Sequence, residues 1–247
     1  MRVVLVTGGT GILGMRLVPL LRERGHEVRV LSRRAGAGTH VGDLKTGEGV
    51  DAAAAGAELV VHAASDVRQR GRSDVQQTRH LLPAVRDARH VVYVSIVGVD
   101  EIPLGYYRRK LLCEHAIATS GVPHTIQRAT QFHTLLEQWL RRAEWLPLAP
   151  VPPDLRLQPV APAEVAQRIA ALLDGEPVGR APDYGGPEVL TSRSIVDTWR
   201  ARRGGPRWVV GLTLPGAVAR AVREGRATCP DHTDGRETWA QFVAGLG

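Results

Sequence analysis

The chain has 247 residues, 43% hydrophobic and 23% charged, a composition that excludes disordered, collagen-like and coiled-coil proteins. Two cysteines are too few for a disulfide framework, and no stretch approaches the ~18 apolar residues of a membrane span. The net charge of +7 rests on 30 arginines and only two lysines, but no run of five basic residues indicates a nucleic-acid site. We expect a cytoplasmic protein, monomeric or homodimeric, whose partner is a small-molecule substrate, with neither nucleic acid nor membrane as partner.

Short β-branched apolar runs alternate with segments of helical period through the first 130 residues. Strands are predicted at residues 2–6, 27–31, 40–41, 58–62, 90–95 and 124–127. Helices are predicted between and after them, at residues 12–24, 49–56, 74–88, 106–120 and 131–144. This alternation predicts an α/β fold of the Rossmann type, a doubly wound parallel sheet covered by helices on both faces.

Six prolines between residues 147 and 162 interrupt this pattern and exclude a long helix there. Beyond them, helices are expected at residues 163–173, 192–202, 215–224 and 236–243, with a short strand at 208–210. We therefore expect a dinucleotide-binding domain over residues 1–145 and a smaller substrate-binding lobe over residues 146–247, packed together as one compact unit.

A glycine-rich turn follows the first predicted strand and opens the first helix. Gly9, Gly11 and Gly14 have the spacing Gly-x-Gly-x-x-Gly, which allows a tight turn, close approach of the backbone to a pyrophosphate and close helix packing. The helix N-terminus then offers free N–H groups to phosphates. The turn is expected to bind a dinucleotide through Thr7, Gly8, Gly9, Thr10, Gly11, Ile12, Leu13 and Gly14.

The second strand is followed by polar and basic residues, Ser32, Arg33 and Arg34. An NAD site favours Asp or Glu here, whereas a 2′-phosphate favours serine and arginine, so we expect NADP(H) in preference to NAD(H). The alternative is a pair of solvated arginines. Further cofactor contacts are expected from Asp43, which either accepts from the adenine amino group or caps a turn, and from Leu44, Ala63, Ala64 and Ser65.

A candidate catalytic set lies around the fifth strand and the helix after it. Ser95 ends the strand, and Tyr106 and Lys110 share one helix face. With four tyrosines and two lysines, roughly 0.03 Tyr-x-x-x-Lys pairs are expected by chance. An ammonium beside Tyr106 favours its phenolate, so Tyr106 is predicted to exchange a proton with substrate, Ser95 to stabilise the alkoxide and Lys110 to hold the nicotinamide ribose. The alternative is a surface aromatic–cation pair with Ser95 as a strand cap.

The chain resembles the atypical short-chain dehydrogenase/reductases of the NmrA-like, NAD(P)-binding family in residues 7–14, 92–98, 106–110 and 126–133. The likeness continues through residues 157–160, 164–166 and 186–188 and so covers most of the chain. It implies a Rossmann-type domain with a small substrate lobe. In similar proteins the segment matching residues 130–133 lines the nicotinamide and substrate pocket, which makes Gln131, Phe132 and His133 pocket candidates here.

Two departures from the family pattern matter. Members of this branch often lack the serine–tyrosine–lysine set and act as redox sensors or as reductases without it. This chain has all three residues, with a short gap of eleven between Ser95 and Tyr106. Glu164 also stands where many members have Asp.

His133, one of the pocket candidates, is either a second acid–base or a structural histidine. Trp139 lines either the pocket or the core.

These features predict an NADP(H)-dependent oxidoreductase that transfers hydride between nicotinamide and a carbonyl or alcohol of a small organic substrate. Tyr106 is its expected general acid/base, and no metal is expected because the histidines show no ligand spacing. Two alternatives remain: a non-catalytic dinucleotide sensor, and an epimerase or dehydratase that uses bound cofactor transiently.

Overall fold

The computed structural model describes residues 1–36, 38–66, 69–144, 148–204 and 208–246. Its contacts divide the chain into two compact units that alternate along the sequence. The first unit comprises Met1–Ser95, Gly105–Arg128 and Val165–Pro182, and the second comprises Ile96–Leu104, Ala129–Glu164 and Asp183–Gly247. Residues 145 and 146, where we expected a single domain boundary, lie outside the described residues, and that boundary stays a prediction.

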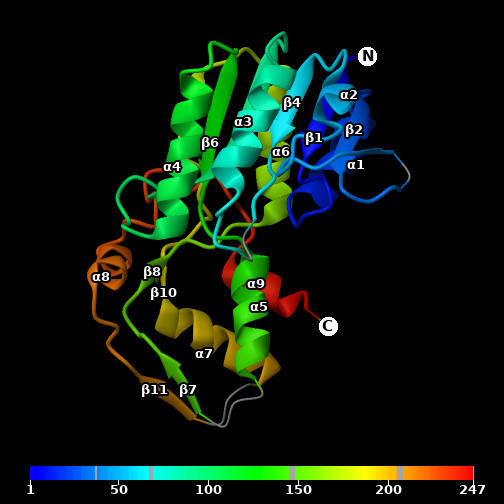
Figure 1. Ribbon diagram of the computed structural model, residues 1–247. Coiled ribbons are helices and arrows are strands. Elements are labelled where there is room, and N and C mark those ends of the chain that lie inside the picture. Colours follow the sequence, from blue (N-terminus) through cyan, green and yellow to red (C-terminus); the bar gives the residue numbers. More distant parts are fainter. Residues whose placement is uncertain (37, 67–68, 145–147, 205–207, 247) are drawn as a thin grey trace. The chain divides into compact units, whose positions relative to one another are not determined.

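A seven-stranded sheet of order β3-β2-β1-β4-β5-β6-β9 forms the framework of the first unit (Figure 1). The strands are β1 (Val3–Thr7), β2 (Glu27–Ser32), β3 (Thr39–Val41), β4 (Leu59–His62), β5 (His90–Ile96), β6 (His124–Ala129) and β9 (Gly179–Arg180). All six strands predicted in this region are present, and the predicted parallel α/β fold is confirmed. The strand order reverses between β1 and β4, and ligands of open α/β sheets bind at the carboxyl ends of strands at such a point.

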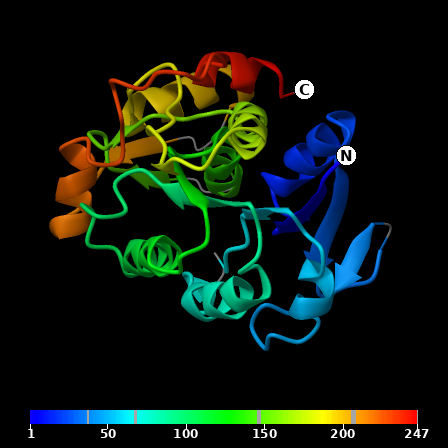
Figure 2. The same ribbon diagram turned by 90° about the horizontal axis from the view of Figure 1, so that it is seen from above.

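Helices cover both faces of this sheet. They are α1 (Gly14–Glu23), α2 (Val50–Ala54), α3 (Asp74–Ala84), α4 (Gly105–Ala118) and α6 (Pro162–Asp174). Figures 1 and 2 show α3 and α4 side by side on one face, with α1 and α6 on the opposite face. Val4, Leu5 and Val6 of β1 are therefore completely buried, which explains why this strand is apolar at successive positions.

The helices of the second unit are α5 (His133–Ala143), α7 (Ser192–Arg203), α8 (Ala217–Arg223) and α9 (Trp239–Ala244). Its core joins Leu136, Ile195, Trp199, Trp239 and Val243, and the two tryptophan rings stack with centroids 6.1 Å apart. The proline-rich segment forms no long helix, as expected. It contributes β7 (Leu148–Val151) and β8 (Arg156–Leu157), which pair with β11 (Trp208–Gly211) and β10 (Leu190–Thr191).

A buried ion pair fastens α4 to β6. Arg128 donates from Nε to Glu114 Oε1 at 2.9 Å and from Nη2 to Oε2 at 2.7 Å, and both side chains are buried. Removing Glu114 leaves the Arg128 charge buried without this carboxylate. We therefore expect Glu114→Ala to lower the free energy of unfolding by about 3 kcal/mol in urea titrations. Asp197→Ala, which removes the exposed pair with Arg193, should cost no more than about 0.5 kcal/mol. Equal losses would contradict the prediction.

Candidate cofactor and active site

A cavity of about 900 Å³ lies at the carboxyl ends of β1, β2 and β4, where the strand order reverses. Most of the residues predicted to bind cofactor line it: Gly8, Thr10, Gly11, Ile12, Ser32, Arg33, Arg34, Asp43, Leu44, Ala63, Ala64 and Ser65. Eight further residues line the cavity without having been predicted: Leu31, Ala35, Gly36, Thr39, Gly42, Lys45, Asp66 and Gln77. The expected segments therefore meet around one space large enough for a small organic ligand.

The glycine turn, residues 8–14, forms a cradle of backbone in which a side chain at Gly8 or Gly14 would overlap neighbouring atoms. Gly8 has a φ of +73°, and a Cβ there would lie 2.7 Å from the Ala63 carbonyl carbon and the Ala64 nitrogen. A Cβ on Gly14 would overlap the Gly8 carbonyl oxygen and the Gly9 Cα, so only glycine lets α1 start this close to β1. The turn brings backbone, not side chains, to the cavity wall, and thus fits a dinucleotide pyrophosphate.

Thr7 holds β1 to β4. Its Oγ1 lies 2.7 Å from His62 Nδ1 and accepts the Ala64 N–H at 3.3 Å. Thr78 Oγ1 donates its proton to the Asp74 carbonyl, so at the 3.0 Å contact with His62 Nε2 the histidine must be the donor. Burial lowers the pKa of His62 to about 3, which keeps the ring neutral with Nδ1 as acceptor for Thr7. Because His62 has one fixed tautomer, the Thr7 hydroxyl keeps one orientation and holds the Ala64 backbone at the cavity wall.

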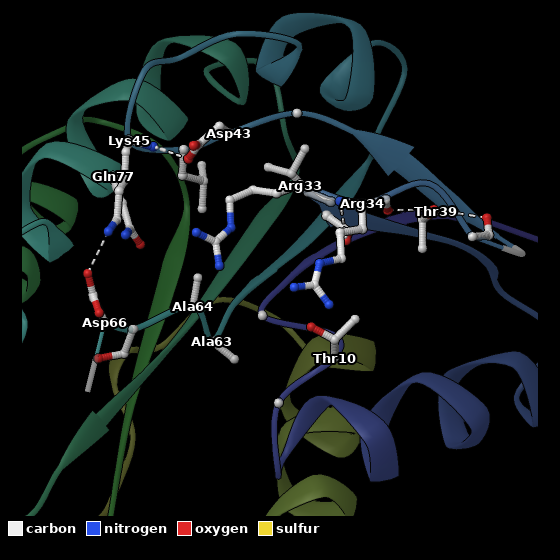
Figure 3. A pocket seen from close by; sticks show the side chains of 18 of the residues that line it. Thr10, Arg33, Arg34, Thr39, Asp43, Lys45, Ala63, Ala64, Asp66 and Gln77 are labelled. Atoms are coloured by element: carbon white, nitrogen blue, oxygen red, sulfur yellow. Dashed lines mark hydrogen bonds and ion pairs between the residues drawn. The ribbon is translucent and has the colours of Figure 1, made fainter. Parts of the chain in front are cut away.

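Arg33 and Arg34 extend from the end of β2 into the cavity, near Thr10, Ala63 and Ala64 (Figure 3). Ser32 Oγ accepts the Arg34 N–H at 3.1 Å, which bends the chain at this point. Within the described residues, no carboxylate or other hydrogen-bond acceptor pairs with either guanidinium. Two arginine side chains thus remain available to an anionic ligand group.

Asp43 caps a turn, one of its two expected roles, because its Oδ1 accepts the Lys45 N–H at 2.8 Å. The Lys45 ammonium in turn lies 2.7 Å from Asp66 Oδ2 and joins the segment after β3 to the segment after β4 (Figure 3). The hydrogen bond from Lys45 lowers the pKa of Asp66. The sequence offered no signal for this pair, since its members meet only through the sheet order.

The predicted Ser95, Tyr106 and Lys110 set is not joined by direct contacts in the structure. Tyr106 Oη lies 2.9 Å from Ser65 Oγ, and Lys110 Nζ donates to the Val94 carbonyl at 2.8 Å while lying 4.2 Å from the centre of the Tyr93 ring. The Ser95 hydroxyl is buried and has no hydrogen-bond partner among the described residues. The residue that meets Tyr106 is therefore Ser65, which we had expected only as a cofactor contact.

The charge state of Tyr106 also differs from the expectation. Burial raises the pKa of Tyr106 to about 12, whereas the nearby ammonium was expected to favour the phenolate. Burial likewise lowers the pKa of Lys110, which is 3% exposed. The physical reason is that burial disfavours the charged phenolate, while the Lys110 ammonium is bound to β5 and the Asp74 charge raises the pKa of Tyr106 further. Tyr106 is thus a neutral phenol, able to donate a proton.

The three pocket candidates belong to the second unit. Both ends of the Gln131 amide bind backbone, with Nε2 donating to Ala227 O at 2.8 Å and Oε1 accepting the Gln158 N–H at 3.1 Å. Phe132 bridges Val160, and His133 is completely buried against Phe242, with ring centroids 4.9 Å apart. Trp139 is 52% exposed and is therefore not a core residue. Their role toward substrate stays a prediction.

His133 makes the stability of the protein depend on pH. Burial lowers its pKa from 6.5 to about 4, so the unfolded chain binds more protons between these values and stability falls as the pH drops through this range. The shift corresponds to a loss on the order of 3 kcal/mol by pH 4. In urea titrations from pH 8 to pH 4, we expect His133→Leu to flatten the decline. His115→Leu, at an exposed histidine, should leave it unchanged.

Among the described residues, no helix is long and apolar enough to cross a membrane. The same residues contain no group of three or more His, Cys, Asp or Glu side chains that could hold a metal ion.

Several known proteins are similar to this chain in sequence or fold. A 3-beta-hydroxysteroid dehydrogenase from Mycolicibacterium neoaurum is 41% identical over 128 residues, a match covering 41% of this chain and 35% of that protein. The chain spans between 22% and 35% of the length of the first curated relatives it matches. An NADPH-dependent quinone oxidoreductase from Escherichia coli, solved with NADPH, shares the fold with a TM-score of 0.81 at 18% identity, covering 98% of this chain and 99% of that one.

A second solved structure with this fold is a nucleoside-diphosphate-sugar epimerase from Staphylococcus aureus. Its TM-score is 0.80 at 14% identity, with 98% of this chain and 99% of that chain covered. The NAD(P)H-binding family matches residues 8–175, more than half of the chain, including the glycine turn and Tyr106. On that match, which contains the cradle and its cavity, the chain belongs to the NAD(P)H-binding family, as its resemblance to the atypical short-chain dehydrogenase/reductases implied.

Proposed function

We propose that the protein is an NADP(H)-dependent oxidoreductase that acts on a carbonyl or alcohol group of a small organic substrate. The observation that carries this proposal is the 2.9 Å hydrogen bond between Tyr106 and Ser65, because Ser65 lines the cofactor cavity. This bond holds a neutral phenol, which can donate a proton, at the cavity wall, where it can exchange a proton with a bound substrate. The dehydrogenase and the quinone oxidoreductase among its relatives support a redox reaction.

A bound nicotinamide would supply or accept the hydride. The backbone of the glycine turn would hold the pyrophosphate, and the neutral Tyr106 would donate its proton to the substrate oxygen during reduction. Ser95, whose hydroxyl lacks a partner in the described part of the chain, is proposed to hydrogen-bond the same oxygen. Lys110 is proposed to hold the nicotinamide ribose from its place beside β5.

The preference for NADP(H) is proposed from the end of β2, where two unpaired guanidiniums and the Ser32 hydroxyl meet and no acidic side chain follows the strand. An acidic residue here would accept from a free ribose hydroxyl, whereas arginines would bind a 2′-phosphate through charge-assisted hydrogen bonds. Ser32, Arg33 and Arg34 would therefore select the phosphorylated cofactor.

The double variant Arg33→Ala/Arg34→Ala tests this preference. Each charge-assisted hydrogen bond contributes about 1.5–3 kcal/mol, so NADPH affinity should fall about 100-fold while NADH affinity stays nearly constant. Calorimetric titration of both cofactors measures the two effects. The matched control is Arg141→Ala/Arg142→Ala, another adjacent pair, located on α5. Equal affinities for NADPH and NADH in the unmodified protein would refute the preference.

A further inference from the structure

The Tyr106 ring packs against Gly71, which lies between β4 and α3. A Cβ on Gly71 would lie 2.7 Å from Tyr106 Cδ2, so the ring packs directly on this backbone. Gly71 has a φ of +70°, and the preceding Arg70 has a φ of 55°, the only described non-glycine residue in the left-handed region. Arg109 Nη1 donates to the Arg70 carbonyl at 3.0 Å and so ties α4 to this segment. The unfavourable φ angle of Arg70 is thus maintained next to the glycine on which the phenol packs.

The direction of each hydrogen bond around Tyr106 follows from counting protons. Ser65 Oγ donates to Asp74 Oδ2 at 2.6 Å, and a serine hydroxyl has only one proton. At the 2.9 Å contact, Tyr106 must therefore donate to Ser65. The other carboxylate oxygen, Asp74 Oδ1, accepts the Asp66 N–H at 2.8 Å. The result is an ordered series from phenol to hydroxyl to carboxylate.

This series ends inside the protein and not in solvent. Asp74 is only 2% exposed, and Lys110, 3% exposed, is the buried cation whose charge interacts with it. The other titratable groups that interact with Tyr106 are Cys113 on the same helix, Tyr93 on β5 and Tyr107, whose ring centroid is 6.1 Å away. Asp74 already accepts the Ser65 proton in a 2.6 Å hydrogen bond, so its carboxylate is the group at the end of the series that can take up that proton.

We propose that Ser65 and Asp74 form a proton relay with Tyr106 and thereby position its proton for the reaction. The relay rests on the proposed oxidoreductase function and replaces Ser95 and Lys110 as the direct partners of the phenol. During alcohol oxidation, the substrate hydroxyl proton moves to Tyr106 Oη, the Tyr106 proton to Ser65 Oγ, and the Ser65 proton to Asp74 Oδ2. The electron pair leaves the substrate carbon as the hydride taken up by oxidised nicotinamide; reduction reverses every transfer.

The relay explains how a phenol that does not ionise serves as a base. Tyr106 passes on one proton as it receives another, so no phenolate is formed. Its raised pKa is then no obstacle, because the group that gains a proton at the end is the Asp74 carboxylate. The Asp74 charge itself contributes to raising the pKa of Tyr106, after the larger effect of burial.

The first test uses the cofactor-free protein with ¹³Cζ-labelled tyrosine, the Tyr106 signal being assigned with Tyr106→Phe. Asp74→Asn removes the charge at the end of the series and should lower the Tyr106 titration midpoint. Ser65→Ala removes the acceptor of the phenol proton, a contact that favours the neutral form, and should lower the midpoint as well. Asp87→Asn and Ser120→Ala, which do not contact Tyr106, are the matched controls. A Tyr106 midpoint unchanged in both relay variants would overturn the proposal.

The second test follows NADPH oxidation with a panel of quinones, aldehydes and ketones. Ser65→Ala and Asp74→Asn should each lower kcat on the order of 10²-fold, Asp74→Asn with KM for NADPH unchanged, and the double variant should lose no more than either single variant. Ser65→Thr, which keeps the hydroxyl, should restore turnover and serves as the test if Asp74→Asn fails to fold. If Tyr106→Phe abolishes turnover but the relay variants do not, the relay alone is wrong; if Tyr106→Phe has no effect, the proposed function is wrong.

Discussion

Tyr106→Phe is expected to lower kcat by about 10²–10⁴-fold and to leave NADPH affinity at the level of the unmodified protein. The substitution removes one oxygen, the one that donates to Ser65, and keeps the ring that packs on Gly71. The glycine turn and the arginines, which are proposed to bind the cofactor, do not contact the phenol in the described structure. NADPH oxidation and calorimetric titration measure the two quantities separately.

Tyr107→Phe is the matched control for this prediction. Tyr107 is the adjacent phenol on α4, and burial raises its pKa to about 12 as well, yet it does not hydrogen-bond Ser65. Its loss should change kcat little. Because Tyr106 also has a pKa of about 12, the pH profile of the unmodified protein should show no tyrosine titration below about pH 10. Similar losses in both variants, or unchanged turnover in Tyr106→Phe, would refute the assigned role.

Gly14→Ala is expected to weaken NADPH binding by more than about 100-fold, because α1 must move away from β1 to admit one methyl group. The added Cβ would overlap the Gly8 carbonyl oxygen and the Gly9 Cα and come within 2.6 Å of the Gly9 carbonyl carbon. These are backbone atoms of the turn itself, so no side-chain rotation relieves the overlap. The phosphate-binding N–H groups would move with them.

Gly175→Ala is the control for a glycine substitution in the same unit. A Cβ there would meet its nearest atoms, the carbonyl oxygens of Leu172 and Ala171, only at 3.6 and 3.7 Å, which are ordinary contacts. NADPH affinity by calorimetry should be unchanged in this variant, and urea titration reports whether either variant is destabilised. Normal NADPH binding by Gly14→Ala would show that the close packing of α1 on the turn is not needed for the cofactor.

The sequence by itself determined the sheet, the glycine turn and the arginines after β2. These features depend on local properties: apolar runs buried on both faces predict strands, Gly14 is required by a turn of consecutive residues, and Arg33 and Arg34 follow their strand directly. Ligand placement at the carboxyl ends of the strands then follows from the general rule for parallel sheets, so most cofactor-binding candidates could be located without coordinates.

The short strands β7, β8, β9 and β10 escaped prediction because they exist only through their pairing with distant segments. The same reason explains why the chain divides into units that alternate along the sequence, which a composition change near residue 145 cannot indicate. Hydrophobic period describes a segment's own faces, but it contains no information on which remote segment covers them.

Only the tertiary structure decided which polar side chains meet. The Tyr-x-x-x-Lys spacing placed Tyr106 and Lys110 on one helix, yet packing directs the ammonium to Val94 and leaves the phenol to Ser65, 41 residues earlier in the chain. Asp74 joins that contact because Gly71, three residues before it in the chain, packs on the Tyr106 ring. The sequence therefore determined the residue types and the strand ends, and packing, which sets side-chain direction and burial, decided the hydrogen bonds and pKa values at the candidate site.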